Sequence, residues 1–271
     1  MTGEAVMIDG LRIAVQHAGK GRPFLFIHGL CGDAGQTLEV FPQIDGWHCI
    51  SPECRGHGRS DAGDKSKFSI AQFTADMVEL AAGLAGPDAH APVIGGISMG
   101  AAIALRAAAL HPEMFSGVVL ARPAWVDQPA PDNLAPHRMI ADDLARQGAK
   151  AARQTFDNSD MARRILEQAP DNMTSYHGFF ERQPTDQTQA LLAAIAHDGP
   201  GIARDDIAAI TLPTLVIGSQ RDLAHPLAMA RELANLVPQA RLAEITPKSD
   251  NRDGYVRDFS AAIGGFLKKM S

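Results

Sequence analysis

One short segment, residues 93–100, constrains the fold of this chain more than any other. It reads Val-Ile-Gly-Gly-Ile-Ser-Met-Gly and is followed at once by the small-residue run Ala-Ala-Ile-Ala-Leu. The pattern indicates a buried strand that turns sharply into a helix, with Ser98 at the turn in a G-x-S-x-G spacing. A serine in such a turn needs a strained backbone, and side chains at Gly96 and Gly100 would collide with the crossing chain. The amides that begin the helix could then hold a developing oxyanion.

Length and charge narrow the class of protein. The 271 residues are 45% hydrophobic, enough for the core of one α/β domain with an insertion. The balance of 25 basic against 31 acidic residues gives a net charge of −6, which argues against nucleic acid and anionic membranes as partners. The first residues lack the features of a signal peptide and no later run would span a bilayer, so we expect a cytoplasmic protein that acts on a small-molecule substrate.

The cysteines agree with a reducing compartment. Cys31, Cys49 and Cys54 form no even-numbered disulfide framework. Cys49, Cys54 and His57 lie near one another in the sequence, but they contain no C-x-x-C pair. We therefore expect no metal site and no cofactor.

Predicted strands and helices alternate along most of the chain. A hairpin comes first, formed by residues 6–8 and 11–15, with its turn at Asp9-Gly10, a dipeptide that accepts the positive φ angles of a type I′ turn. The apolar run at residues 23–27 is typical of a central strand covered on both faces. Further strands are expected at residues 47–51, 93–97, 117–120, 214–218 and 241–245, and helices at residues 70–84, 101–105, 227–236 and about 255–266.

The alternation stops at residues 122–205. Four prolines are spread over its first part, at positions 123, 129, 131 and 136. Charged amphipathic segments follow at residues 139–147 and 161–168, without a convincing strand. We expect a helical lid, or cap, at residues 122–205, inserted into a core formed by residues 1–121 and 206–271. Because open α/β sheets bind ligands at the carboxyl ends of their strands, the cap should cover that edge.

Four segments at the expected strand ends resemble, in order, the motifs of the α/β-hydrolase fold family. They are His28-Gly29, the loop at residues 55–60, the G-x-S-x-G turn, and the loop at residues 218–226 with a G-x-x-x-D-x-x-x-P spacing. The resemblance covers nearly all of the chain apart from the cap. It implies an α/β fold with a mostly parallel, doubly wound sheet and an inserted helical cap, and an activity of the serine esterase type.

The resemblance also implies roles for single residues. Ser98 corresponds to the nucleophile and Asp222 to the acid that orients a base. The backbone amides of Leu30 and Met99 correspond to the oxyanion hole, which a tetrahedral intermediate requires. The backbone of His28 would lie near the site, and its side chain would be either structural or a substrate contact.

The catalytic histidine of the family is missing from its usual place. It is expected after the strand at residues 241–245, but no histidine follows His225 in the chain. His225, three residues after Asp222, could serve as the base or line the pocket. Lys248 lies in the loop where the histidine is expected, and it could act as a Ser-Lys base or be a solvated loop lysine. In the third alternative the site is not that of a serine hydrolase.

Arg122 and Trp125 are candidates for substrate binding, because they follow the strand beside the G-x-S-x-G turn. Arg122 could clamp a carboxylate or a hydroxyl-rich substrate, or form a surface ion pair. Trp125 could stack on the substrate or pack inside the cap. The sequence as a whole favours hydrolysis of a small ester or lactone through an acyl-enzyme on Ser98. The alternatives are a carbon–carbon bond hydrolase acting on a diketone and a catalytically degenerate ligand-binding protein.

Overall fold

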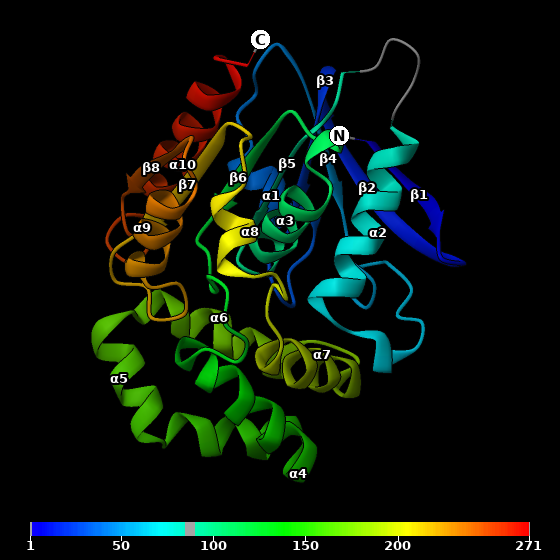
Figure 1. The fold of residues 1–271 in the computed structure, drawn as a ribbon. Helices are drawn as coiled ribbons and strands as arrows, with labels where there is room; N and C mark the ends of the chain where they lie inside the picture. Colours follow the sequence, from blue (N-terminus) through cyan, green and yellow to red (C-terminus); the bar gives the residue numbers. More distant parts are fainter. Residues whose placement is uncertain (1, 85–89, 271) are drawn as a thin grey trace.

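The computed structural model describes residues 2–84 and 90–270, which form one mostly parallel sheet with helices around it (Figure 1). The strands lie in the order β1-β2-β4-β3-β5-β6-β7-β8; β1 and β2 are antiparallel to their neighbours and the other pairs are parallel. The strand bounds are β1 Thr2–Ile8, β2 Leu11–Gly19, β3 Gly21–Ile27, β4 Gly46–Pro52, β5 Val93–Ile97, β6 Gly117–Ala121, β7 Thr214–Ser219 and β8 Ala240–Ile245. The doubly wound α/β fold predicted from the sequence is confirmed.

The helices of the core lie on both faces of this sheet. One apolar cluster packs α2, α3, α8 and α9 against one face, and a second cluster packs α1 and α10 against the other. The bounds are α1 Ala34–Val40, α2 Ile70–Gly83, α3 Met99–Leu110, α8 Arg204–Ala208, α9 Leu227–Leu236 and α10 Arg252–Leu267. Strands β5, β6 and β7 are buried along their whole length because helices cover both of their faces.

The N-terminal hairpin forms as its turn residues predict. Ile8 pairs with Leu11, which leaves Asp9 and Gly10 as a two-residue loop. Both loop residues have positive φ, 48° and 73°, as a type I′ turn requires. The hairpin continues the sheet beyond β4 and lies away from the ends of β5 and β6.

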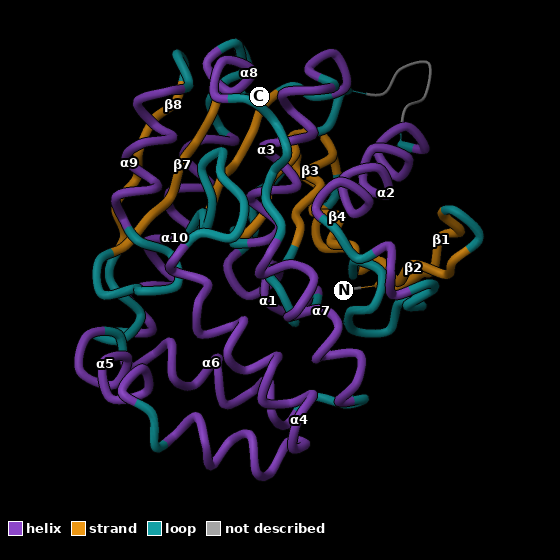
Figure 2. The backbone as a smooth tube through the Cα atoms, turned by 60° about the horizontal axis from the view of Figure 1, so that its bottom comes forward, coloured by secondary structure: helices purple, strands orange, loops and turns teal. Residues whose placement is uncertain are grey.

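Residues 122–205 contain the helices α4 Ala135–Asp157, α5 Asp160–Gln168, α6 Pro170–Glu181 and α7 Thr185–His197. Figures 1 and 2 both show α4, α5 and α6 together at one end of the molecule, beyond the strands. These helices share their own apolar cluster, which includes Phe156, Ile165 and Phe180. Helix α4 is interrupted at Gly148, where φ is 73° and ψ is 169°. We refer to α4–α7 as the cap helices.

The cap helices meet the loops that follow the carboxyl ends of the strands. After α6, Arg182 donates hydrogen bonds to the backbone oxygens of Cys31, beyond β3, and Gly56, beyond β4. Gln187 of α7 donates to the same oxygen of Gly56. None of the helices in the described residues is both long enough and apolar enough to cross a bilayer.

Candidate active site

Ser98 lies between β5 and α3 in a strained conformation. Its φ is 57° and its ψ is −110°, a region that residues with a side chain rarely adopt. The chain passes so closely here that a Cβ atom on Gly96 would lie 2.1 Å from the carbonyl carbon of Gly100. A Cβ atom on Gly100 would lie 2.3 Å from the backbone oxygen of Ile27. The two glycines are therefore required by close packing, and together they present the Ser98 side chain at the end of the sheet.

Two free amides accompany this serine. Among the described residues, neither the amide of Met99, which begins α3, nor the amide of Leu30 has a hydrogen-bond partner. The loop that carries Leu30 is held by Gly29, whose amide donates to Oε1 of Gln36 at 2.6 Å and whose oxygen accepts from the amide of Gly32 at 2.9 Å. Leu30, Gln36 and Ser98 all line one pocket. Two preorganised donors beside a nucleophile are what an oxyanion hole requires.

The side chain of His28 is structural. It is completely buried, and its Nε2 accepts a hydrogen bond from the Cys54 amide at 3.0 Å. Because Nε2 is an acceptor, Nδ1 carries the proton and donates to the oxygen of Gly29 at 2.7 Å. Burial lowers the pKa of His28, which keeps the ring neutral. The ring links the loops after β3 and β4 and does not line the Ser98 pocket, so a substrate contact by this side chain was the wrong alternative.

His57 supports the same two loops. Its ring packs against that of His28, with 4.8 Å between the ring centroids, and its Nδ1 bonds with the backbone oxygen of Arg55 at 3.1 Å. Cys54, in the loop after β4, and Cys49, within β4, are both buried, and burial raises the pKa of both thiols. Within residues 2–84 and 90–270, no group of three His, Cys, Asp or Glu side chains is arranged to hold a metal ion.

Asp222, in the loop after β7, is the most heavily bonded group at the site. Oδ2 accepts from Nε and Nη2 of Arg122 at 2.8 and 2.7 Å. Oδ1 accepts from Nδ2 of Asn172 at 3.0 Å and from the amide of His225 at 3.1 Å. Burial acts to raise the pKa of Asp222, but the charge of Arg122 and the bonds from His225 outweigh it and hold the pKa far below its ordinary value. The carboxylate is therefore ionised throughout the physiological pH range.

His225 is bound to this carboxylate through one ring nitrogen. Nδ1 lies 3.0 Å from both oxygens of Asp222, so it carries a proton and donates it to the carboxylate. Burial lowers the pKa of His225 and the nearby charge of Arg122 lowers it further, although Asp222 opposes both effects. His225 is therefore neutral at neutral pH, with an unprotonated Nε2.

Ser98 and His225 line the same pocket. Its volume is about 80 Å³, and the other lining residues include Leu30, Gln36 and Arg122 from the core and His137, Asn172, Ser175, Tyr176 and Phe179 from the cap helices. In the part of the chain that the structure describes, no hydrogen bond involves Oγ of Ser98 or Nε2 of His225. The nucleophile candidate and the base candidate thus face a small common space that is left for a ligand.

Lys248 is placed differently from His225. Its Nζ lies 3.4 Å from Oδ1 of Asp171, and its side chain is 29% exposed. It lines a separate, smaller cavity on the other side of Arg122 and Asp222, and it does not line the pocket that holds Ser98. The geometry therefore favours His225 over Lys248 as the group that can reach the serine.

Neither residue considered for substrate binding after β6 is free to bind one. Arg122 is buried, and besides Asp222 its Nη1 donates to the hydroxyl of Tyr255 at 3.3 Å. Arg122 lines the pocket and its guanidinium is engaged within the protein, so its ion pair is buried and not on the surface as one alternative expected. Trp125 is 2% exposed, its Nε1 donates to the oxygen of Asp198, and its ring packs in the core cluster outside the pocket.

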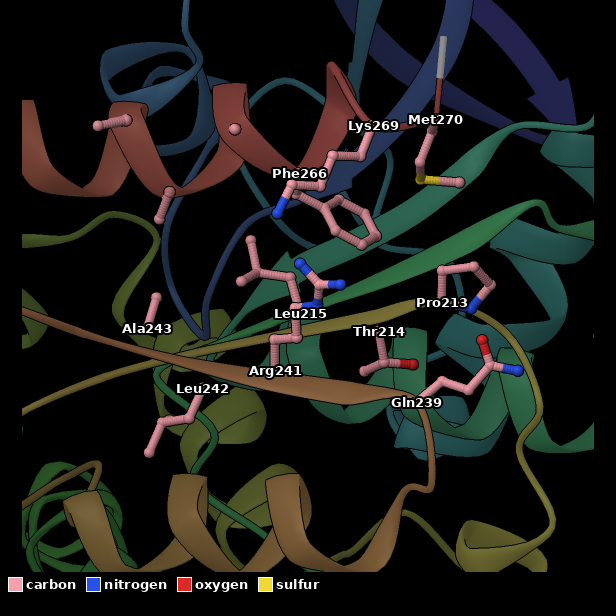
Figure 3. A pocket seen from close by; sticks show the side chains of 13 residues that line it. Pro213, Thr214, Leu215, Gln239, Arg241, Leu242, Ala243, Phe266, Lys269 and Met270 are labelled. Atoms are coloured by element: carbon pink, nitrogen blue, oxygen red, sulfur yellow. The ribbon is translucent and has the colours of Figure 1, made fainter.

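A larger cavity, of about 520 Å³, lies between β7, β8 and the end of α10. Figure 3 shows Phe266, Lys269 and Met270 facing Leu215 and Arg241 across it. Neither Ser98 nor the Asp222–His225 pair lines this cavity, and it contains no nucleophile with a neighbouring base. Size alone therefore does not identify the functional site.

The sequence did not point to several residues of the site. Gln36 holds the Leu30 loop, Asn172 and Tyr255 hold the groups around Asp222, and His137 and Tyr176 line the cap side of the pocket. Apart from Gln36, each comes from a helix distant in sequence from Ser98 and Asp222. Only Gln36 lies close enough to a recognised motif, eight residues after His28, for its position to be a usable signal.

Comparison with known proteins matches this architecture. Residues 22–248 match the profile of the family described as alpha/beta hydrolase fold. The chain belongs to the α/β-hydrolase fold family. The mostly parallel sheet and the helices on both of its faces are therefore features of the family in this protein.

The individual proteins that resemble this chain share 30% or less of its sequence in the three examples that follow. An esterase from Thermogutta terrifontis has a TM-score of 0.75 at 19% identity and covers 100% of this chain and 99% of its own. The enol-lactonase from Burkholderia xenovorans LB400 has a TM-score of 0.71 at 22% identity, with 98% and 100% covered. A putative non-heme haloperoxidase of Mycobacterium phage D29 is 30% identical over 118 residues, 42% of this chain and 41% of that protein. The chain thus spans less than half the length of the curated relatives it matches, and the structural likenesses show the fold.

Proposed function

We propose that this protein hydrolyses a small ester or lactone through an acyl-enzyme formed on Ser98, with His225 as the general base. The observation that carries the proposal is the pocket shared by the strained Ser98 and by His225, whose Nδ1 is bound to Asp222. A serine hydroxyl is a weak nucleophile at neutral pH and needs a neighbouring base that a third group orients. Names of structural relatives, an esterase and an enol-lactonase, support the same reaction class.

The reaction would proceed in two steps, acylation of Ser98 and hydrolysis of the acyl-enzyme. Oγ of Ser98 attacks the carbonyl carbon while Nε2 of His225 takes the hydroxyl proton, and the amides of Leu30 and Met99 hold the oxyanion. The intermediate collapses, the bond to the alkoxy oxygen breaks, and His225 returns the proton to the departing alcohol. Water then repeats the sequence on the acyl-enzyme, losing its proton to His225, and releases the acid and free Ser98. With a lactone substrate, the alcohol and the acid leave as one molecule.

The Asp222–His225 arrangement accounts for the missing late histidine. A base must be neutral before it reacts and must be stabilised once it holds a proton. His225 is neutral because burial lowers its pKa, and the ionised Asp222 beside Nδ1 stabilises the imidazolium that forms. Placing the base three residues after the acid, in the same loop, keeps both functions without a contribution from the loop after β8.

The pocket restricts the substrate to small molecules. Its volume of about 80 Å³ is well below the several hundred Å³ typical of sites for drug-sized ligands. Helix α6 closes much of the cap side of the pocket, because Asn172, Tyr176 and Phe179 all line it. Short acyl groups and small lactones fit this space, whereas long acyl chains would require the cap helices to move.

Labelling with a fluorophosphonate probe tests the proposal. The probe should modify Ser98 in the wild-type protein, as located by peptide mass spectrometry, and Ser98→Ala should lose both labelling and hydrolysis of p-nitrophenyl acetate. Ser175→Ala is the matched control, because Ser175 lines the pocket from the exposed side of α6 and has no neighbouring acid–base pair. Hydrolysis that persists in Ser98→Ala would contradict the serine mechanism. Binding of esters without turnover would favour the degenerate ligand-binding alternative.

A further inference from the structure

Three buried polar atoms in the cap helices have no hydrogen-bond partner among the described residues. One is Oδ2 of Asp143, a residue that does not line the Ser98 pocket. The other two are the hydroxyl of Tyr176, in α6, and Nδ1 of His137, in α4, and both of these residues line the pocket. The residues are 1% and 7% exposed. Leaving such groups buried and unpaired costs free energy, and native proteins pair nearly all of them. Because the two residues lie side by side, these atoms call for a partner that the described residues do not supply.

Both residues face the candidate active site. Their rings meet edge to face, with 5.2 Å between the centroids, and both line the pocket that contains Ser98 and His225. Tyr176 also packs against Phe156 and Phe179, which fixes the ring in the cap cluster. The two residues that carry the unpaired atoms thus form part of the cap side of the pocket wall.

The electrostatics of this wall select a neutral ligand group. Burial lowers the pKa of His137 to about 3 and raises the pKa of Tyr176, so both side chains are uncharged at neutral pH. The charged groups beside them, Arg122 and Asp222, are already paired with each other. A carboxylate or an ammonium group would find no free counter-charge here and would lose its hydration.

We propose that Tyr176 and His137 bind a hydroxyl group of the substrate, so that the preferred substrates are small hydroxy-substituted esters or lactones. A hydroxyl group matches both atoms, because it can accept a hydrogen bond from the Tyr176 hydroxyl and donate one to Nδ1 of His137. This inference rests on the proposed function, which supplies the substrate class, small esters and lactones. It adds that a hydroxyl group on the substrate decides which of these molecules binds most tightly.

Binding to Ser98→Ala tests recognition without turnover. γ-Butyrolactone is compared by NMR titration with its α-hydroxy and β-hydroxy derivatives, so that ring size is constant and only the hydroxyl changes. We expect at least one hydroxylactone to bind about tenfold more tightly than the parent lactone, because its hydroxyl group would form a hydrogen bond with Tyr176 or His137. Equal binding of all three lactones would overturn the proposal.

Variants of the two residues locate the effect. In the Ser98→Ala background, Tyr176→Phe removes only the hydroxyl and should reduce the preference to about one, and His137→Leu should reduce it as well. Thr188→Val is the matched control, since Thr188 carries another buried hydroxyl in the cap helices, bonds the backbone oxygen of Pro184 and does not line the pocket. A preference that survives Tyr176→Phe, or one that disappears in Thr188→Val alone, contradicts the assignment. Cooperative thermal unfolding of each variant confirms that it is folded.

The two proposals fail in different ways. If wild-type protein hydrolyses lactones but Ser98→Ala binds all of them equally, the hydrolase proposal stands and the hydroxyl site is wrong. If Ser98→Ala prefers a hydroxylactone through Tyr176 but the wild-type protein hydrolyses none, the hydroxyl site stands and the proposed function is wrong.

Discussion

The two sides of the Ser98 pocket are built in different ways. On the serine side, backbone atoms pack against backbone atoms: Gly96 against Gly100, and Gly100 against Ile27. On the acid side, Asp222 is held by side chains from separate elements, among them Arg122 after β6 and Asn172 from α6. The first arrangement is encoded within a few consecutive residues, whereas the second exists only after the cap and the core have come together. A single side-chain substitution should therefore disturb the acid side without changing the serine side, whose geometry depends on the backbone.

Arg122 should carry the largest single contribution on that side. Arg122→Met leaves Asp222 buried without its counter-charge, which is expected to lower the free energy of unfolding by about 3–5 kcal/mol. Urea denaturation measures this loss. Arg221→Met is the matched control, because Arg221 pairs with Asp250 on the surface, where such pairs contribute about 0–1 kcal/mol. Equal losses in the two variants would show that the buried pair does not organise the acid side.

His225 should have the largest effect on the chemical step. Removal of a general base typically reduces turnover a hundredfold or more, so His225→Ala should reduce kcat by at least that factor. Lys248→Ala should change kcat no more than a few-fold, since Lys248 pairs with Asp171 outside the pocket. Both kcat and KM are measured for each variant with p-nitrophenyl acetate as the substrate. The reverse pattern would make Lys248 the base, and two small effects would exclude both residues.

The same contrast explains what the sequence could predict. Strands β3 to β8, helices α2 and α9 and the turn at Ser98 depend on apolar periodicity and on glycines that are close in sequence, and they were predicted to within about two residues. The short core helices α1 and α8 were not predicted, and the hairpin strands and α3 are longer than predicted. The α/β-hydrolase resemblance located Asp222 by its spacing after a strand. The roles of Asn172, Tyr255 and Tyr176 were not predictable, because each depends on how distant helices pack and no local pattern marks it.

Asn172 links the cap to the acid loop and should have an intermediate effect. Its Nδ2 donates to Asp222, and its Oδ1 accepts from the amides of Leu223 and Ala224. Asn172→Ala leaves the two amides without a partner and removes one of the hydrogen bonds to Asp222. We expect kcat to fall about tenfold as the loop loses its fixed geometry. Asn158→Ala, which changes an exposed cap asparagine, is the control. A change confined to KM would make Asn172 a substrate contact rather than a positioning residue.

The pH profile tests the electrostatics of the acid side without a mutation. His225 accepts a proton only while neutral, so kcat/KM should fall as the pH decreases through the pKa of His225. Because burial and the charge of Arg122 lower that pKa from 6.5, the midpoint of the acid limb should lie below pH 6.5. Initial rates measured between about pH 4.5 and 8 define the limb. A midpoint above pH 6.5 would mean that the charge of Asp222 outweighs burial at this site.

The smallest effect should come from Tyr255, whose hydroxyl accepts a single 3.3 Å hydrogen bond from Arg122. Tyr255→Phe should lower the free energy of unfolding by about 0.5–1.5 kcal/mol, the net value of one such bond. A double-mutant cycle separates this bond from the packing of the ring. In the Arg122→Met background the Tyr255 hydroxyl has already lost its donor, so its removal breaks no bond to residue 122. We expect Tyr255→Phe to cost less in that background than in the wild type. An equal cost in both backgrounds would assign the effect to packing against Phe259, whose ring meets that of Tyr255 edge to face. In that case Asp222 would be organised by Arg122, Asn172 and His225 alone, and the acid side would depend on fewer elements than the structure indicates.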